Sequence, residues 1–210
     1  MKTEIIQVHS DNPQKRLISH IVKIIISGGV IVIPTDSGFS IVTSLDNKTG
    51  IDRIRKIRKL SKRHDFTLML ESFGHIGEFA KMNNDAFRLM KRVLPGAYTF
   101  ILEATRQVPN RLVHPKKKTI GIRISSNTIV QDILQELSQP IISVSLIIEG
   151  YEFLNTEDVV EALDNKVDVI IDSAYCPAVP TSVIDFTKNP YEILRKGAGD
   201  TSLILEWGII

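Results

Sequence analysis

Hydroxyl and carboxylate side chains gather in one short turn of the sequence, which directly follows the apolar run 31–33. Pro34 cannot donate to a strand ladder, and Gly38 can adopt a positive φ angle. The segment therefore predicts the end of a strand, where Thr35, Asp36 and Ser37 display their side chains at the mouth of a sheet. Ligands commonly bind at such loops, so these side chains are candidate binding groups.

Further hydroxyl groups and one arginine lie on expected strands. Ser143 and Ser145 share one side of an expected strand, and Ser182 begins another. Arg123 alternates with isoleucines in a third strand, so its side chain points to the opposite face, where an arginine usually holds an anion or a carboxylate. Hydroxyls and cations together bind and orient phosphates, but they supply no obvious nucleophile or general base.

Basic residues are concentrated in the first part of the chain. Residues 1–125 contain 22 Lys and Arg against 10 Asp and Glu, whereas residues 126–210 contain 4 against 14. Two clusters stand out: Arg53, Arg55, Lys56, Arg58, Lys59, Lys62 and Arg63 in the first, and Arg111, His114, Lys116, Lys117 and Lys118 in the second. Such an imbalance predicts a polyanionic partner, either a nucleic acid, a nucleoside triphosphate or pyrophosphate. The alternative is a solvated basic helix surface.

Several classes of protein are excluded by what the sequence lacks. Cys176 is the only cysteine, so no intrachain disulfide can form, and no apolar run approaches ~18 residues. We expect a cytoplasmic protein with one domain, residues 1–210, because no linker-like segment interrupts the chain. The triplet beginning at Asp36 matches that of aspartic proteases, but long helical periods exclude that fold. No metal-binding or covalent-catalysis motif is present.

Apolar periodicity predicts strands that alternate with helices, followed by a hairpin near the end of the chain. The expected strands are 4–8, 31–33, 67–70, 98–103, 119–124, 141–146, 169–172, 182–186 and 191–195. The expected helices begin after Asn12, near Ile51 and at the caps Asn84 and Asn127, and the acidic segment 155–164 is expected to form a further surface helix. This order indicates an α/β domain with a mixed sheet.

Six motifs, in this order over nearly the whole chain, resemble the YrdC domain of the threonylcarbamoyl-AMP synthases, and most closely its YciO branch. They are the segments 34–39, 95–100, 121–123, 143–146, 180–185 and 195–197, and a basic helix end at 58–61 follows the first of them. The resemblance implies a YrdC-like twisted, open mixed sheet with flanking helices and a concave basic surface. It also implies the synthesis of threonylcarbamoyl-AMP and pyrophosphate from ATP, L-threonine and bicarbonate, with Mg²⁺ accompanying the nucleotide, in the tRNA threonylcarbamoyladenosine pathway.

The resemblance assigns roles to individual residues but no catalytic side chain. Thr35 would line the threonine site, Arg58 would face the nucleotide phosphates, and Ser143 with Ser145 would contact ATP. The full set of expected substrate- and nucleotide-binding residues is Thr35, Ser37, Arg58, Lys62, Arg123, Ser143, Ser145, Ser182 and Arg195. YrdC-like proteins are also associated with double-stranded RNA, for which the expected residues are Arg55, Lys59, Arg63, Lys116, Lys117 and Lys118.

Three positions depart from the pattern of the synthases. Leu60 stands where they have an arginine, Ser145 where they have an asparagine, and Phe39 where they have a tyrosine. Each lost charge-assisted hydrogen bond is worth roughly 1.5–3 kcal/mol. We therefore expect a synthase-like activity that is weakened or redirected. The alternatives are a protein that binds double-stranded RNA or tRNA without synthase activity, and a small-molecule sensor on the same fold.

Overall fold

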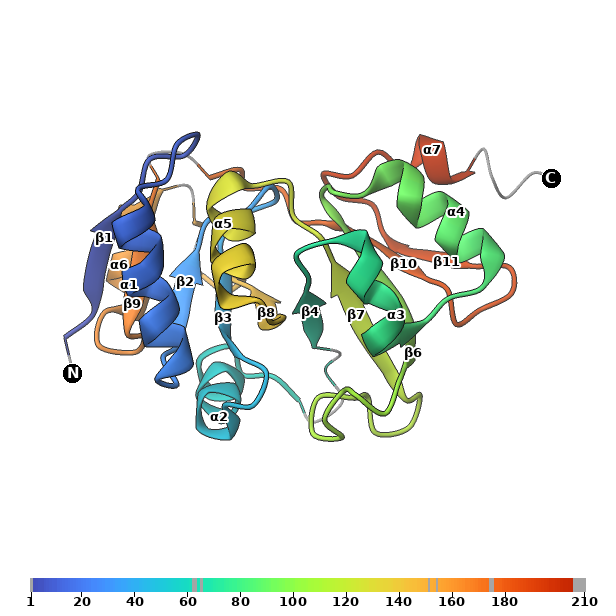
Figure 1. The fold of residues 1–210 in the computed structure, drawn as a ribbon, viewed down its shortest axis with the longest axis horizontal. Coiled ribbons are helices and arrows are strands. Elements are labelled where there is room, and N and C mark those ends of the chain that lie inside the picture. Colours follow the sequence, from blue (N-terminus) through green and yellow to red (C-terminus); the bar gives the residue numbers. More distant parts are fainter. Residues whose placement is uncertain are drawn as a thin grey trace.

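Eleven strands form one mixed, open sheet in the part of the chain that the computed structural model describes, residues 2–61, 64, 66–150, 152–153, 155–173 and 176–205. Along the sheet the strands follow the order β1-β9-β2-β3-β8-β4-β7-β6-β10-β11, and β5 pairs with β6 outside this path. β1 and β11 lie at opposite ends of this path, so the sheet stays open, as Figure 1 shows. The predicted mixed, open α/β sheet is confirmed.

The bounds of these elements are as follows. The strands are β1 (Glu4–Gln7), β2 (Ile31–Ile33), β3 (Ser40–Ser44), β4 (Thr67–Met69), β5 (Ala80–Lys81), β6 (Tyr98–Ala104), β7 (Thr119–Arg123), β8 (Ile141–Ser145), β9 (Val169–Asp172), β10 (Ser182–Asp185) and β11 (Glu192–Arg195). The helices are α1 (Lys15–Ile26), α2 (Lys48–Ile57), the 3₁₀ turn η1 (Phe73–His75), α3 (Ile76–Phe79), α4 (Asn84–Val93), α5 (Thr128–Leu137), α6 (Thr156–Leu163) and α7 (Ser202–Leu205).

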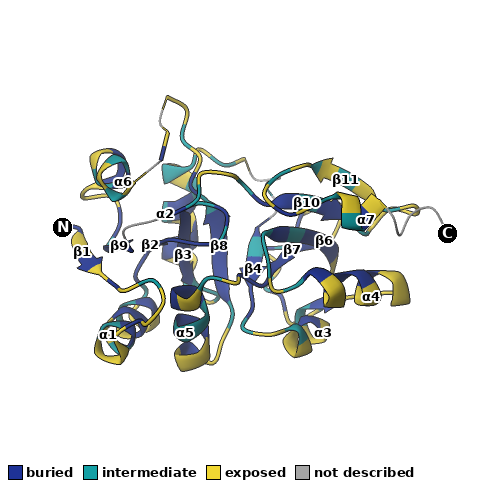
Figure 2. Cartoon of the chain, turned by 90° about the horizontal axis from the view of Figure 1, so that it is seen from above, coloured by how far each residue is buried: buried dark blue, intermediate teal, exposed yellow. Residues whose placement is uncertain are grey.

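Helices cover both faces of the half of the sheet that contains β2. On one face α1 and α5 pack side by side, and their apolar residues form one core with Ile31 and Ile33. On the other face α2 and α6 share a second core with Val32 and Ile41. Figure 2 shows these two helix pairs on opposite sides of the sheet. Because β2 is buried on both sides, its sequence is an uninterrupted apolar run.

The other half of the sheet has one apolar and one polar face. Leu89 and Met90 of α4 belong to the same core as Phe100 of β6 and Ile122 of β7. Thr99 and Ile101 of β6 and Gly121 of β7, which alternate with these, lie on the opposite face and line a cavity. Alternation along the strands therefore separates the core from a polar surface in this half.

Two helix caps differ from the prediction by one or two residues. α1 begins at Lys15 with Gln14 as its cap, and no side chain caps it. Asn12 instead donates its backbone N–H to Nδ1 of His9, which closes a separate turn. α4 is capped by Asn83, whose side chain accepts from the Ala86 N–H, and not by the predicted Asn84.

The segment from η1 to β5 and the short helix α7 have too few periodic residues to be seen in the sequence. No helix in the described part of the chain is both long and apolar enough to span a membrane.

Candidate functional site

Two cavities meet on the polar side of the sheet. The polar cavity has a volume of about 400 Å³, and its polar lining is Arg58, Ser61, His64, Thr67, Thr99, Ser143, Ser145, Thr181 and Arg195. The apolar cavity has a volume of about 460 Å³ and is lined by Ser37, Gly38, Phe39, Ser145, Leu146, Ile147, Glu152, Phe153, Ala178 and Pro180. Ser145 and Ile147 line both cavities, so the two spaces adjoin at the end of β8.

Strand register builds the floor of the polar cavity. Ser143 of β8 pairs with Thr67 of β4, which pairs with Gly121 of β7, which in turn pairs with Ile101 of β6. All four residues line the cavity, because residues paired across a sheet project to the same face. A Cβ atom at Gly121 would lie only 2.7 Å from Oγ1 of Thr67, so glycine keeps this row free of steric conflict.

Two arginines face the polar cavity without a carboxylate partner. Arg58 is the C-cap of α2, and its Nε donates to the carbonyl oxygen of Ser145 at 2.7 Å. Burial lowers the pKa of Arg58, and burial together with nearby Arg123 lowers the pKa of Arg195. Within the described residues neither Arg58 nor Arg195 forms an ion pair. Two uncompensated guanidinium groups at one cavity favour the binding of an anion.

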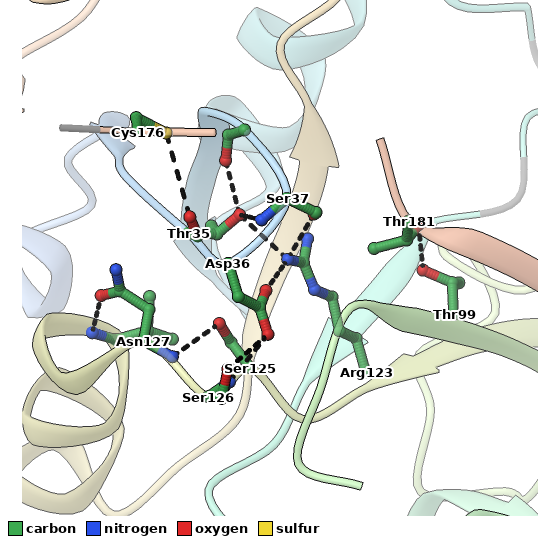
Figure 3. Close-up of polar contacts among 12 residues, drawn as sticks. Thr35, Asp36, Ser37, Thr99, Arg123, Ser125, Ser126, Asn127, Cys176 and Thr181 are labelled. Atoms are coloured by element: carbon green, nitrogen blue, oxygen red, sulfur yellow. Dashed lines mark hydrogen bonds and ion pairs between the residues drawn. The ribbon is translucent and has the colours of Figure 1, made fainter. Parts of the chain in front are cut away.

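Hydroxyl groups fix the position of Arg195. Its Nε donates to the carbonyl oxygen of Thr181 at 2.8 Å, and its Nη2 donates to the Thr181 hydroxyl at 3.0 Å. That hydroxyl also lies 2.9 Å from the hydroxyl of Thr99 (Figure 3). Ser182, by contrast, is fully buried: its hydroxyl donates to the Gly199 carbonyl at 2.6 Å and accepts from the Gly197 N–H at 2.8 Å. Ser182 thus ties the chain after β11 to β10 and does not line either cavity.

The turn between β2 and β3 is held by Arg123 (Figure 3). Nη2 of Arg123 donates to the hydroxyls of Thr35 at 2.9 Å and Ser37 at 2.6 Å, and it forms an ion pair with Asp36. Burial alone would raise the pKa of Asp36, but the charge of Arg123 and a hydrogen bond from Ser126 outweigh it, so this pKa lies below its usual value. Asp36 is therefore ionised and structural at neutral pH.

Cys176 lies beside the same turn. Its Sγ is 3.9 Å from the carbonyl oxygen of Thr35, and burial is the main cause that raises the pKa of this thiol to about 11. A thiol with so high a pKa is almost entirely protonated at neutral pH, which makes it a poor nucleophile. The only cysteine of the chain is therefore not a catalytic candidate.

The structure brings together some of the predicted binding residues and separates others. Arg58, Ser143, Ser145 and Arg195 line the polar cavity, and Ser37 lines the apolar cavity. Thr35, Arg123 and Ser182 are buried behind these surfaces and line neither cavity. Lys62, like Arg63 of the predicted RNA-binding set, lies outside the described residues.

The residues predicted to bind nucleic acid do not share one environment. Arg55 donates to the carbonyl oxygens of Ser61 and Arg111 and stacks over Phe66, 4.6 Å from the ring centre. Lys59 is exposed, and so are Lys116, Lys117 and Lys118, which lie in the loop between β6 and β7. RNA binding and a concave basic surface remain predictions from the sequence.

Sequence reasoning missed Thr67 and Gly121 in the floor of the cavity and misjudged Leu60. Thr67 and Gly121 are brought together only by strand pairing, which leaves no local signal. Leu60 packs against the apolar core and does not line the polar cavity. An arginine introduced at position 60 would therefore replace a side chain that packs against the core and does not face the polar cavity.

Comparisons with known proteins agree on the family. A family model for the Sua5/YciO/YrdC domain, described as "Telomere recombination", matches residues 23–197. The chain is 44% identical to YciO of Escherichia coli over 200 residues, which cover 94% of this chain and 97% of that protein. The crystal structure of E. coli YciO has a TM-score of 0.92 at 42% identity, covering 96% of this chain and 98% of that one.

Two further proteins carry names that refer to threonine. A putative threonylcarbamoyl-AMP synthase of Methanocaldococcus jannaschii is 25% identical over 202 residues, 94% of each chain. The structure of P. abyssi Sua5 complexed with L-threonine has a TM-score of 0.90 at 24% identity, covering 98% of this chain and 61% of that one. At this identity the second likeness shows the fold alone.

Proposed function

Because the chain belongs to the Sua5/YciO/YrdC family, we propose that it binds ATP and catalyses a threonylcarbamoyl-AMP synthase-like reaction with weakened or redirected activity. The observation that carries this proposal is the polar cavity, in which Arg58 and Arg195 have no carboxylate partner among the described residues. The distant synthase of M. jannaschii supports the reaction class. L-threonine and bicarbonate are the other proposed substrates.

The two cavities differ in their chemistry, so we assign a different substrate to each of them. We assign the triphosphate to the polar cavity, where guanidinium and hydroxyl donors are concentrated. The amino acid is assigned to the apolar cavity, whose wall includes Ser37 and Gly38. Ser145 lines both spaces, so the α-phosphorus and the acceptor would meet beside it.

The attack on ATP in this reaction needs no general base, so neither His64 of the polar cavity nor Glu152 of the apolar cavity is given that role. The ammonium group of threonine first loses a proton to solvent, and the neutral amine and bicarbonate then form a carbamate with loss of water, so that the carbamate carries an anionic oxygen. That oxygen attacks the α-phosphorus of ATP, and the bond from the α-phosphorus to the bridging oxygen breaks to release pyrophosphate. No proton has to be removed in this step, so catalysis rests on positioning and on charge stabilisation.

Mg²⁺ would accompany the nucleotide. In the described part of the chain no cluster of three His, Cys, Asp or Glu side chains could hold a metal ion. The ion would therefore be bound mainly by phosphate oxygens and water, as Mg²⁺ commonly is in nucleotide sites. Arg58 and Arg195 would supply the protein's share of the positive charge.

The proposed weakening of the synthase activity follows from hydrogen-bond donors that are fewer among the described lining residues of the polar cavity than in the pattern of the synthases. At Ser145 the cavity has one hydroxyl where an amide would offer two N–H groups. Leu60 packs against the core and does not line the cavity, so it takes no part in this loss. One preorganised donor is typically worth ~10²–10³ in rate. A slow synthase is the expected result.

The test is pyrophosphate release by the purified chain with ATP, Mg²⁺, L-threonine and bicarbonate, with one component omitted at a time. We expect slow release that requires both threonine and bicarbonate. Release that is indifferent to both of them would rule out synthase chemistry. The nucleotide assignment is tested separately by calorimetric titration with ATP.

A further inference from the structure

The guanidinium of Arg123 makes all of its described hydrogen bonds through one nitrogen. Nη2 donates to the hydroxyls of Thr35 and Ser37 and to the carboxylate of Asp36, whereas Nε has no hydrogen-bond partner within the described residues. The whole residue is only 2% exposed, and it lines neither the polar nor the apolar cavity. Arg123 therefore lies behind the residues that line the two cavities.

The turn that Arg123 holds is one wall of the apolar cavity. Ser37 and Gly38 line that cavity, and Gly38 has a φ angle of 113°, in the region that favours glycine. The Thr35 hydroxyl donates to the Gly38 carbonyl at 2.5 Å, so the turn is also closed on itself. Arg123 joins this closed turn to the end of β7.

Asp36 gives the turn a second attachment. Its Oδ2 accepts from the backbone N–H of Ser126 at 2.8 Å and from the Ser126 hydroxyl at 3.1 Å. Ser126 directly precedes Asn127, the N-cap of α5. The ion pair with Arg123 and these two bonds fix the turn from two sides. The charge of Arg123 also lowers the pKa of Arg195, but within the described residues no hydrogen bond links the turn to Arg58 or Arg195.

We infer that Arg123 is a positioning residue that shapes the amino-acid side of the site, and that it governs acceptor binding but not phosphate binding. This inference rests on the proposed function, because it uses the assignment of the amino acid to the apolar cavity. It replaces the sequence-based expectation that Arg123 contacts the nucleotide. Arg195 and Arg58 keep the phosphate-binding role.

The bonding pattern predicts which replacement preserves the function. Nη2 has two N–H groups for three oxygen atoms, whereas a lysine ammonium has three N–H groups on one nitrogen. Arg123→Lys therefore retains the charge and a single-nitrogen donor, although its side chain is shorter by about one bond. Arg123→Met keeps a similar stem and loses every donor. Arg123→Met combined with Asp36→Asn removes both charges, which avoids leaving a buried carboxylate unpaired.

The experiment measures binding of ATP and of L-threonine separately by calorimetry, in the wild type and in the three variants. We expect Arg123→Met, or the double variant where the single one folds poorly, to weaken L-threonine binding about tenfold or more, the effect of losing charge-assisted bonds. ATP binding should change less than about twofold, and Arg123→Lys should recover most of the threonine affinity.

The matched control is Arg53→Met, which removes another arginine–aspartate pair, with Asp168 at 2.6 Å, and neither residue of this pair is in the lining of either cavity. It should leave both affinities unchanged. The inference is overturned if ATP and threonine affinities fall together in the Arg123 variants, or if Arg53→Met has the same effect. Wild-type protein that binds ATP but not threonine would overturn it too, while the nucleotide part of the proposed function would stand.

Hydrogen exchange of the intact chain separates a failure of the inference from a failure of the proposed function. If the wild type binds neither ligand, the proposed function fails. Faster exchange confined to residues 35–40 in Arg123→Met, and absent in Arg53→Met, would still support positioning of the turn. Unchanged exchange in that segment would overturn it.

Discussion

Arg58 and Ser145 are joined by a 2.7 Å hydrogen bond in which Nε of the arginine donates to the serine carbonyl oxygen. The bond links the end of α2 to the end of β8, and it holds the guanidinium at the polar cavity. The two Nη atoms form no hydrogen bond within the described residues. Arg58 thus offers donors that are already oriented and not yet used, which lowers the entropy cost of binding an anion.

Replacing Arg58 by methionine should weaken ATP binding. The loss of one or two charge-assisted bonds is worth about 1.5–3 kcal/mol, or roughly ten- to a hundredfold in affinity. Lys56→Met is the matched control, since it removes an exposed positive charge from the same helix outside the cavity. Titration calorimetry measures both variants. Equal losses in the two variants would show that only net charge matters.

Changing Leu60 and Ser145 separately should give opposite results. The hydroxyl of Ser145 has no hydrogen-bond partner within the described residues, and it faces both cavities, so Ser145→Asn should raise threonine-dependent pyrophosphate release. Leu60→Arg should lower the melting temperature without raising the rate, because Leu60 packs against the core. Rate and thermal melting are measured on both variants. A rate gain from Leu60→Arg alone would contradict this assignment.

Ser182→Ala should cost stability more than it costs affinity. The variant loses two buried hydrogen bonds, to the Gly199 carbonyl and from the Gly197 N–H. This loss should lower the free energy of unfolding by about 1–3 kcal/mol. Ser138→Ala, at an exposed helix end, is the control and should change stability little. Denaturant titration measures the difference. A large loss of ATP affinity in Ser182→Ala at unchanged stability would show that the hydroxyl contacts the nucleotide.

The stabilising effect of Asp36 should disappear in acid. Its pKa is lower in the folded than in the unfolded chain, so its contribution is complete above the unfolded value of about 3.9 and is lost as the pH falls through the folded value. Asp36→Asn should be destabilised by about 3 kcal/mol near neutral pH, because it leaves Arg123 unpaired.

The difference between Asp36→Asn and the wild type should then shrink as the pH drops below about 4. Denaturant titrations across this range measure the free energy of unfolding of both proteins. A difference that stays constant down to the lowest pH would mean that Asp36 does not carry the charge that holds Arg123.

Local patterns in the sequence predicted most elements of this fold, because strand alternation and helical periodicity follow from neighbouring residues. The strand 31–33 and the helix capped by Asn127 are confirmed at the expected places. The site is harder to predict, since its floor depends on register between strands that are distant in sequence. Thr67 and Gly121 face each other only because β4 pairs with β7.

Burial also changed the roles of residues that the sequence analysis had selected by their residue type. Arg123 was predicted on the correct face of its strand, and it does hold a carboxylate, that of Asp36. Its enclosure behind the turn could not be read from alternation alone, because alternation gives direction and not depth. The same holds for Ser182, whose hydroxyl is used within the protein.

The floor of the polar cavity has a consequence for the order of folding during synthesis. It takes residues from β4, β6, β7, β8 and β10, and Arg195, one of its two arginines, comes from β11, the last strand in the described part of the chain. Contacts between residues so far apart in sequence form slowly, because long loops must close first. Helix pairs and local hairpins can form while the chain is still emerging from the ribosome, but the anion-binding site is completed only after β10 and β11 have been made. A nascent chain that stops before Arg195 would fold in part and would lack one of the two arginines to which we assign the triphosphate.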